Sequence, residues 1–134
     1  MRFDIHNEVL QKPAFNPATI NSDTTTTGAI IDTQGFEALE FVMQAGTISA
    51  GTFTPLIEES DAADLSGSNA VADADLLGTE AAAALSASNT AKRVGYRGDK
   101  RYVRLSIVSA SSANGVVGAL AILGKPMLAK TASA

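Results

Sequence analysis

The sequence contains no cysteine and no tryptophan, and it has a single histidine among its 134 residues. Without cysteine the chain cannot form a disulfide, a thiolate metal site or a thiol nucleophile. The histidine, His6, lies in the N-terminal segment with no cysteine beside it, so we expect neither a catalytic triad nor a metal site there. No phosphate-binding glycine motif is present. The residues therefore predict no enzymatic activity and no cofactor.

Long apolar runs are also missing from the sequence. The most apolar stretch, residues 116–123, is far shorter than the ~20 residues that a membrane helix requires. Asp4 and Glu8 stand where a secretory signal would need a basic start and an apolar run. Together with the lack of cysteine, these features predict a soluble protein made in a reducing cytoplasm, with no membrane partner.

Charges of the two signs are concentrated in different parts of the chain. Residues 13–91 contain eleven acids and no lysine or arginine, whereas residues 92–134 contain eight bases and a single acid, Asp99. This division suits contacts between copies or with a charged partner, because opposite potentials speed encounter and fix register. Pairing of the two halves within one folded subunit is the alternative. The sequence leaves both interpretations open.

A basic cluster, residues 92–104, contains two interleaved tyrosines, Tyr96 and Tyr102. Charge combined with aromatic stacking is typical of proteins that bind single-stranded nucleic acid. The net charge of −4 and an aromatic content of 5% argue against that function. We expect the arginines of the cluster to pair with carboxylates of the acidic half or of a partner, and we expect no nucleic-acid partner.

Two segments show the alternation of a half-buried strand. In residues 36–46, Leu39, Phe41 and Met43 fall on one face, and in residues 100–107, Val103, Leu105 and Ile107 do the same. A period of two with one polar face predicts antiparallel strands that cover a core. Several short strands separated by turn residues predict a mainly β fold, a small antiparallel β-sandwich or barrel.

Residues 94–123 are expected to contain the central hairpin of this fold. The runs 101–110 and 116–123 flank Asn114-Gly115, a dipeptide that favours the positive φ of a hairpin turn. Both faces of the second run are apolar, so it lies between two layers or contacts another subunit. The residues expected to point inward are Val116, Leu120 and Ile122, and those expected on the opposite face are Val117, Ala119 and Ala121.

Residues 61–89 differ from the rest in being rich in alanine, serine, aspartate and glycine. They predict a long, exposed, acidic excursion with a short helical turn at residues 73–77, closed by Gly78. Pro55, just before it, cannot donate a ladder hydrogen bond and predicts a strand at a sheet edge. Calcium ligation by the acids is disfavoured against a solvated loop, because the spacing of an EF-hand is absent.

The first 24 residues carry Pro13 and Pro17 but also the large apolar residues Phe3, Ile5 and Phe15. We interpret them as an extended arm that docks on its own body or on a neighbour, with an ordinary first strand and loop as the alternative. The predicted organisation is thus an arm at residues 1–24, a β-sandwich body at 25–126 and a C-terminal tail at 127–134.

Five segments together resemble small structural proteins of tailed bacteriophages and prophages, which are encoded among head-assembly genes. They are residues 32–42 (DTQGFEALEFV), 51–61 (GTFTPLIEESD), 75–79 (DLLGT), 94–104 (VGYRGDKRYVR) and 123–126 (LGKP). The run Gly-Tyr-x-Gly-x-Lys-Arg-Tyr-Val-Arg is the most specific part. The resemblance covers about residues 31–126 and brings no residue-level functional assignment with it.

The resemblance implies a non-enzymatic virion protein made in the bacterial host cytoplasm, and within that class it favours a capsid decoration (cement) protein. Its expected partners are the major capsid protein and other copies of itself, and its expected location is the capsid surface. A neck or tail adaptor and a host-surface or carbohydrate-binding β-module are the alternatives; the lack of tryptophan speaks against the second. Candidate interface residues are Phe3, Ile5, Phe15, Arg97, Lys100, Arg101, Arg104, Val117, Ala119 and Ala121.

Overall fold

A computed structural model describes residues 4–126 of the chain. Nearly all of its regular structure is antiparallel strand, with one short 3-10 turn, so the prediction of a mainly β fold with a short helical excursion is confirmed. In chain order the elements are β1 (Val9–Ile20), β2 (Thr25–Thr26), β3 (Ile30–Asp32), β4 (Phe36–Ser60), β5 (Asn69–Ala70), η1 (Asp73–Asp75), β6 (Leu76–Leu77), β7 (Ala91–Tyr96) and β8 (Tyr102–Pro126).

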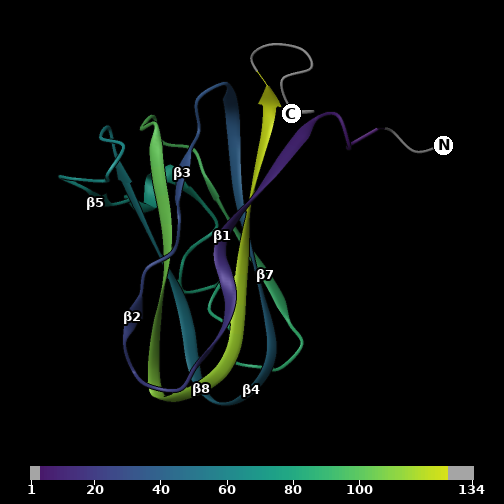
Figure 1. Cartoon of the computed structure of the whole chain (residues 1–134), viewed down its shortest axis with the longest axis vertical. Coiled ribbons are helices and arrows are strands. Elements are labelled where there is room, and N and C mark those ends of the chain that lie inside the picture. The colour runs from purple at the N-terminus through teal and green to yellow at the C-terminus, as the bar shows by residue number, and fades with distance from the viewer. Residues whose placement is uncertain (1–3, 127–134) are drawn as a thin grey trace.

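The two long strands, β4 and β8, each bend and contribute to both layers of the molecule (Figure 1). Residues 36–45 of β4 pair with residues 117–126 of β8, and residues 52–60 pair with residues 102–110. Register shifts separate the two paired regions, where the strands turn from one layer into the other. Bends of this kind are how strands switch sheets at the corners of a sandwich.

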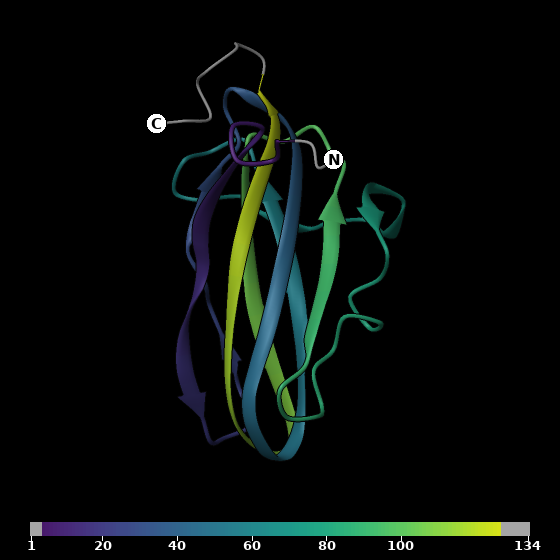
Figure 2. The ribbon, with the colours of Figure 1, turned by 90° about the vertical axis from the view of Figure 1, so that its right-hand side faces the viewer.

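Each layer is completed by the shorter strands. The strand order in the first layer is β1, residues 117–126 of β8, residues 36–45 of β4, β7 and β6. The second layer is built around residues 102–110 of β8 paired with residues 52–60 of β4. There β2 and β3 pair with β8, and β5 pairs with β4. Figure 2 looks onto the first layer, in which β1 (purple) and β7 (green) lie on either side of the paired β8 and β4. The fold is therefore a small two-layer sandwich held together by two shared strands.

The prediction of a central hairpin in residues 94–123 is wrong. Its two runs belong to one bent strand, β8, and both pair with β4. The left-handed residues at the bend are Ser111 and Ser112, with φ of 64° and 60°. The Asp23 carboxylate accepts hydrogen bonds from the backbone N–H groups of Ser112 (3.1 Å) and Ala113 (2.8 Å), and these bonds lower the pKa of Asp23. A carboxylate distant in the sequence thus stabilises the bend, and the residues with positive φ, Ser111 and Ser112, do not form a turn motif that could be recognised from the sequence.

The inward faces of the two clearly alternating segments are as predicted. The side chains of Leu39, Phe41 and Met43, and of Val103, Leu105 and Ile107, are buried in the core. The faces predicted for residues 116–123 are inverted. The small side chains Val117, Ala119 and Ala121 point into the core, and Leu120 is 46% exposed. On the inward face, Ala121 lies opposite Phe41 and Ala119 lies opposite Met43, so large and small residues alternate across the pairing.

Most of the predicted arm that is described docks on its own chain. Residues 9–20 form β1, which pairs with β8 and buries Phe15 in the core. This is one of the two arrangements that the sequence left open. Phe3 lies outside the described residues, and Ile5 is exposed. Phe15 is therefore a core residue and not a partner anchor.

The acidic excursion is less exposed than its composition predicts, because Val71, Leu76, Ala83 and Leu85 are buried. Leu85 exchanges backbone hydrogen bonds with Phe53 (2.9 and 2.8 Å) on the side of β4 that faces away from β8. On the same side, the Glu80 carboxylate accepts a hydrogen bond from Ile57 N at 2.7 Å. Burial raises the pKa of Glu80, against the lowering effect of that bond. The excursion thus covers the edge of β4 that an additional strand would otherwise occupy. Pro55 lies on this part of β4, and because proline has no backbone N–H group it needs no hydrogen-bond acceptor there.

Candidate contact surfaces

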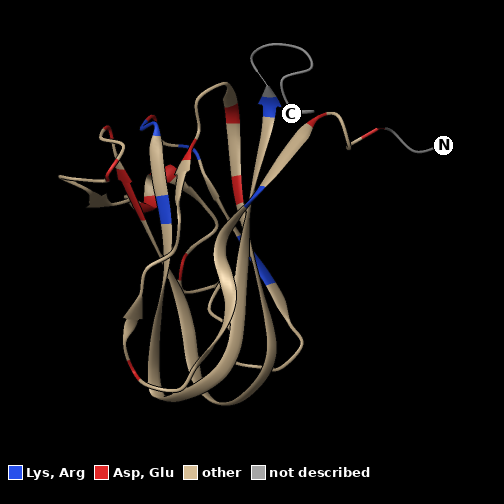
Figure 3. Cartoon of the chain, in the orientation of Figure 1, with Lys and Arg blue, Asp and Glu red and all other residues tan. Residues whose placement is uncertain are grey.

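The basic cluster pairs with the acidic half of the same chain. Arg101 forms a two-pronged ion pair with Asp32 (2.8 and 2.9 Å), Lys100 pairs with Asp61 (2.9 Å), and Arg104 pairs with Glu58 (3.0 Å). The first of these pairs lowers the pKa of Asp32. Most charged residues gather at the end of the sandwich that carries these pairs (Figure 3). The charge asymmetry of the sequence is therefore neutralised in part within the subunit, by ion pairs between the acidic and the basic halves.

Arg97 differs from its neighbours, since it forms no ion pair with any residue between 4 and 126. Its backbone N–H donates to Asp75 O at 2.8 Å, which fixes the loop. Its side chain is exposed. Among the four basic candidates that the sequence singled out, Arg97 is the one whose charge is not already satisfied by the subunit.

The loop between β7 and β8 is fixed by the Tyr96 hydroxyl. This hydroxyl donates to the Glu59 carboxylate at 2.6 Å and accepts from Lys100 N at 3.0 Å. Burial, together with the bond to Glu59, raises the pKa of Tyr96, so the hydroxyl stays protonated and can donate. Gly98 lies directly against the Tyr96 ring, where a side chain would collide with it.

Replacing Tyr96 by phenylalanine is expected to lower the free energy of unfolding by roughly 1–3 kcal/mol, because it leaves the Glu59 carboxylate and the Lys100 N–H without their partner. Urea denaturation measures the change. Tyr102→Phe is the matched control, because the Tyr102 hydroxyl forms no hydrogen bond within the described part of the chain, and we expect less than about 0.5 kcal/mol there. Equal losses for the two variants would contradict the role assigned to Tyr96.

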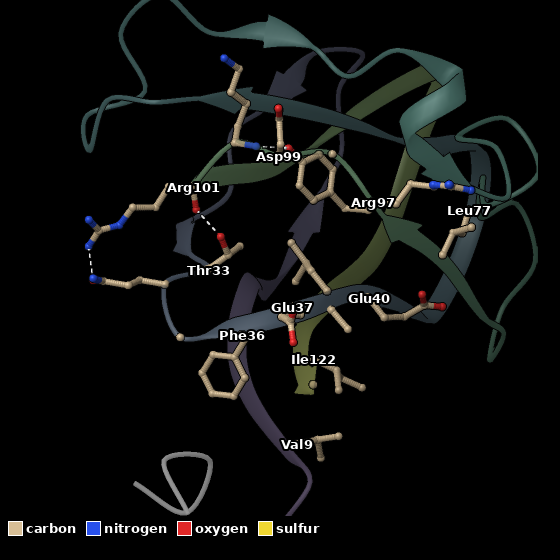
Figure 4. Close-up of a pocket in the computed structure, with 18 residues that line it drawn as sticks. Val9, Thr33, Phe36, Glu37, Glu40, Leu77, Arg97, Asp99, Arg101 and Ile122 are labelled. Atoms are coloured by element: carbon tan, nitrogen blue, oxygen red, sulfur yellow. Dashed lines mark hydrogen bonds between the residues drawn. The ribbon is translucent and has the colours of Figure 1, made fainter. Parts of the chain in front are cut away.

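A hollow of about 820 Å³, the loop-end hollow, lies between residues 33–36 and the β7–β8 loop. Phe36, Ile122 and Leu77 give it apolar walls, and Arg97 lies at its rim beside Leu77 (Figure 4). Leu77 is 54% exposed. Gly124 also lines the hollow, and a Cβ atom added there would meet nothing closer than 3.8 Å. The hollow is thus concave and mostly apolar, and it is bordered by Arg97, Glu37 and Asp99, none of which forms an ion pair within residues 4–126.

Four of the five segments that carry the phage resemblance meet at this hollow. It is lined by residues 33–40, by Leu77, by residues 96–101 and by Gly124. The fifth segment supplies Glu59 and Asp61, which bind Tyr96 and Lys100 behind the loop. The hollow could not be found from the sequence, because its lining comes from stretches that only the β4–β8 pairing brings together.

A second surface, the outward face, lies on the first layer around Leu120. In register, Leu120 stands between Pro13 of β1 and Val42 of β4, and Arg93 of β7 follows Val42. Leu120 exposes 46% of its surface, although β8 has a paired strand on each side. This is the apolar strand face that the sequence predicted, but the residues that form it are those expected to point inward.

The structure leaves few of the predicted interface residues available for contacts. Val117, Ala119, Ala121 and Phe15 are in the core; Lys100, Arg101 and Arg104 are paired within the subunit; Ile5 and Arg97 are exposed; and Phe3 lies outside the described residues. Leu77 and Leu120 were not predicted from the sequence as candidate contact residues, although both are large, apolar and exposed. Leu77 lies in a segment predicted to be exposed, and Leu120 lies in a strand that is apolar on both faces. A large apolar residue in such a segment is the sequence feature that could have identified them.

Two further observations concern residues 4–126 alone. In this part of the chain, no three histidine or acidic side chains come close enough together to hold a metal ion. No helix there is long and apolar enough to cross a membrane.

The fold defines a class, the small two-layer antiparallel β-sandwiches with strands shared between the layers. Among solved structures, the chain is similar to the PBSX exported protein XepA, with 16% identity and a TM-score of 0.59 over 89% of this chain and 38% of XepA. It is also similar to the SPBc2 prophage-derived protein YomS, with 13% identity and a TM-score of 0.50 over 88% of this chain and 94% of YomS. No protein-family model and no curated protein sequence matches the chain. At these identities the likeness shows a shared fold, and this chain spans well under half of XepA.

Proposed function

We propose that this chain is a non-enzymatic structural protein of a tailed-phage particle that decorates the outer surface of the capsid in many copies. Its partner in this role is the major capsid protein. The resemblance of five sequence segments to phage head-assembly proteins supports the proposal, and so does a fold shared with two prophage-derived proteins.

The outward face is the observation that carries the proposal. Leu120, Val42 and Pro13 place three apolar side chains in one row across neighbouring strands, with Leu120 nearly half exposed. An exposed apolar row on a sheet marks a contact surface when it is continuous across strands. A strand cannot easily be added at the nearby edge, because Pro13 and Pro17 of β1 lack N–H groups. Face-on attachment to a flat protein lattice suits this geometry.

The proposal is tested by mixing the purified protein with capsid shells that lack it. Bound copies are counted by sedimentation and gel densitometry, and shell stability is followed by thermal melting. We expect saturation at on the order of hundreds of copies per shell, with a raised melting temperature, because many weak equivalent contacts add up. Saturation at about a dozen copies would indicate a neck or tail position instead, and absence of binding would contradict attachment to the head.

Leu120→Ser is expected to weaken attachment to the shells roughly 10-fold, the loss that corresponds to about half a buried leucine side chain. Ile30→Ser is the matched control, since Ile30 is a 37% exposed apolar residue on β3 of the other layer. The control should bind as the unmodified protein does. Equal weakening by both variants would remove the outward face as the attachment surface.

A further inference from the structure

The C-terminal end of β8 brings the chain to the edge of the loop-end hollow. Ile122 and Gly124 of this strand line the hollow. Pro126, the last residue of the strand, pairs with Phe36, which also lines it. Lys125 has a left-handed φ of 50°, and a left-handed residue turns the chain out of the straight course of a strand. The residues after Pro126 therefore start beside the hollow and need not continue along the line of β8.

The next four residues are suited to an apolar site in composition and in reach. Residues 127–130, Met-Leu-Ala-Lys, follow Pro126 directly and lie outside the described residues. Met127 and Leu128 are two consecutive large apolar residues, and covering them removes apolar surface from water. Four extended residues span up to about 14 Å. The segment can therefore cross the hollow without any movement of β8.

The hollow has apolar walls that the described chain leaves open. Phe36 and Ile122 are only half-buried, and Leu77 is 54% exposed. Gly124 contributes no side chain, and a Cβ atom there would meet nothing closer than 3.8 Å. The volume of about 820 Å³ lies within the range of sites that enclose a small ligand, so it can take two large side chains.

The charges around the hollow favour a basic occupant. Glu37, Asp99 and Arg97 line it without forming an ion pair within residues 4–126, whereas the other charged lining residues are paired. Two carboxylates and one guanidinium leave an excess of one negative charge. Residues 127–130 carry one lysine, Lys130, and no acid. Opposite charges around an apolar contact fix its register.

We propose that residues 127–130 of this chain bind across its own loop-end hollow, with Met127 and Leu128 against the apolar walls and Lys130 directed toward Asp99. Asp99 lies on the β7–β8 loop, across the hollow from Phe36, where the segment begins (Figure 4). The connection to β8 keeps the segment at a high effective concentration, so contacts too weak to hold a separate molecule suffice. The inference is independent of capsid attachment, for which the outward face is proposed.

The lack of cysteine in the sequence allows one reactive thiol to be placed in the segment. We expect Leu128→Cys to react with iodoacetamide at least ~10-fold more slowly in the folded protein than in urea, because a docked side chain is shielded from the reagent. Ser133→Cys, beyond the docked residues, is the control and should react at similar rates in both conditions. Circular dichroism verifies that every variant is folded without urea.

Filling the hollow shows whether it is the docking site. Gly124→Leu has room for its side chain, and combined with Leu128→Cys it should raise the reaction rate in the folded protein most of the way to that of Ser133→Cys. Equal rates for the two single-thiol variants, or shielding that Gly124→Leu leaves unchanged, would overturn the proposal. Shielding that increases with protein concentration would also overturn it, because it would indicate binding to the hollow of a second copy.

Discussion

Replacing Gly51 by alanine is expected to remove at least about 3 kcal/mol from the free energy of unfolding. Gly51 lies at the bend of β4 with φ of +84°, a conformation that disfavours residues with a Cβ atom. A Cβ atom there would also come within 2.5 Å of both Ala110 O and Ala113 Cα, which are backbone atoms of the bend in β8. The two bends press against each other at this glycine. The midpoint and slope of urea denaturation report the loss.

Two other glycines separate the causes of that effect. Gly35 has φ of +91° with nothing within 4 Å of an added Cβ, so Gly35→Ala should show the conformational cost alone, about 1 kcal/mol. At Gly28, which has no positive φ, an added Cβ would collide with Leu105 O and Ala14 O. Gly28→Ala should therefore show the steric cost alone, about 2 kcal/mol. A Gly51→Ala loss no larger than that of Gly35→Ala would show that the bends yield to the new methyl group.

Replacing Leu85 by alanine is expected to cost about 2–5 kcal/mol of unfolding free energy, the range for leucine removed from a packed core. Leu85 is fully buried, although it lies in the acidic excursion whose composition predicts exposure. Its backbone is bonded to Phe53 of β4, so the cavity cannot close by movement of a free loop. Chemical denaturation, followed by circular dichroism, measures the loss.

Leu77→Ala is the matched control in the same excursion. Leu77 is 54% exposed and lines the loop-end hollow, so its truncation should cost less than about 1 kcal/mol. Similar small losses for both leucines would mean that the excursion is only loosely attached to the body. A large difference would establish it as a replacement for an edge strand.

Local pattern predicted the strands whose two faces differ in polarity. Residues 36–46 and 100–107 each carry one polar face, so their periodicity fixed which side chains enter the core. Residues 116–123 are apolar on both faces, and periodicity cannot choose between two apolar faces. The choice is made by volume, because the alanines fit beside Phe41 and Met43 whereas Leu120 does not, and that comparison requires the strand register.

The contacts missed from the sequence are all long-range. Asp23 stabilises the bend at Ser112, Glu80 binds Ile57 N, and four separate segments line the loop-end hollow. Asn114-Gly115 carries the local signal for a turn, yet the left-handed residues are two serines held by a carboxylate some ninety positions earlier. The position of the bend is therefore set by the hydrogen bonds from Asp23, which form only in the folded chain, and not by the local turn propensity of Asn114-Gly115.

The pairing of β8 also sets the order in which the protein can fold during synthesis. β1, β2, β3 and β4 all pair with β8, and the pair Phe36–Pro126 joins the two ends of the long strands. A nascent chain that has emerged only as far as Arg101 lacks β8, which is the partner of β1, β2 and β3 and one of the partners of β4, so much of its apolar surface stays uncovered until the 25 residues of β8 leave the ribosome. Such chains complete folding only late in synthesis. Until then, their uncovered apolar surface can bind chaperones or aggregate with other nascent chains.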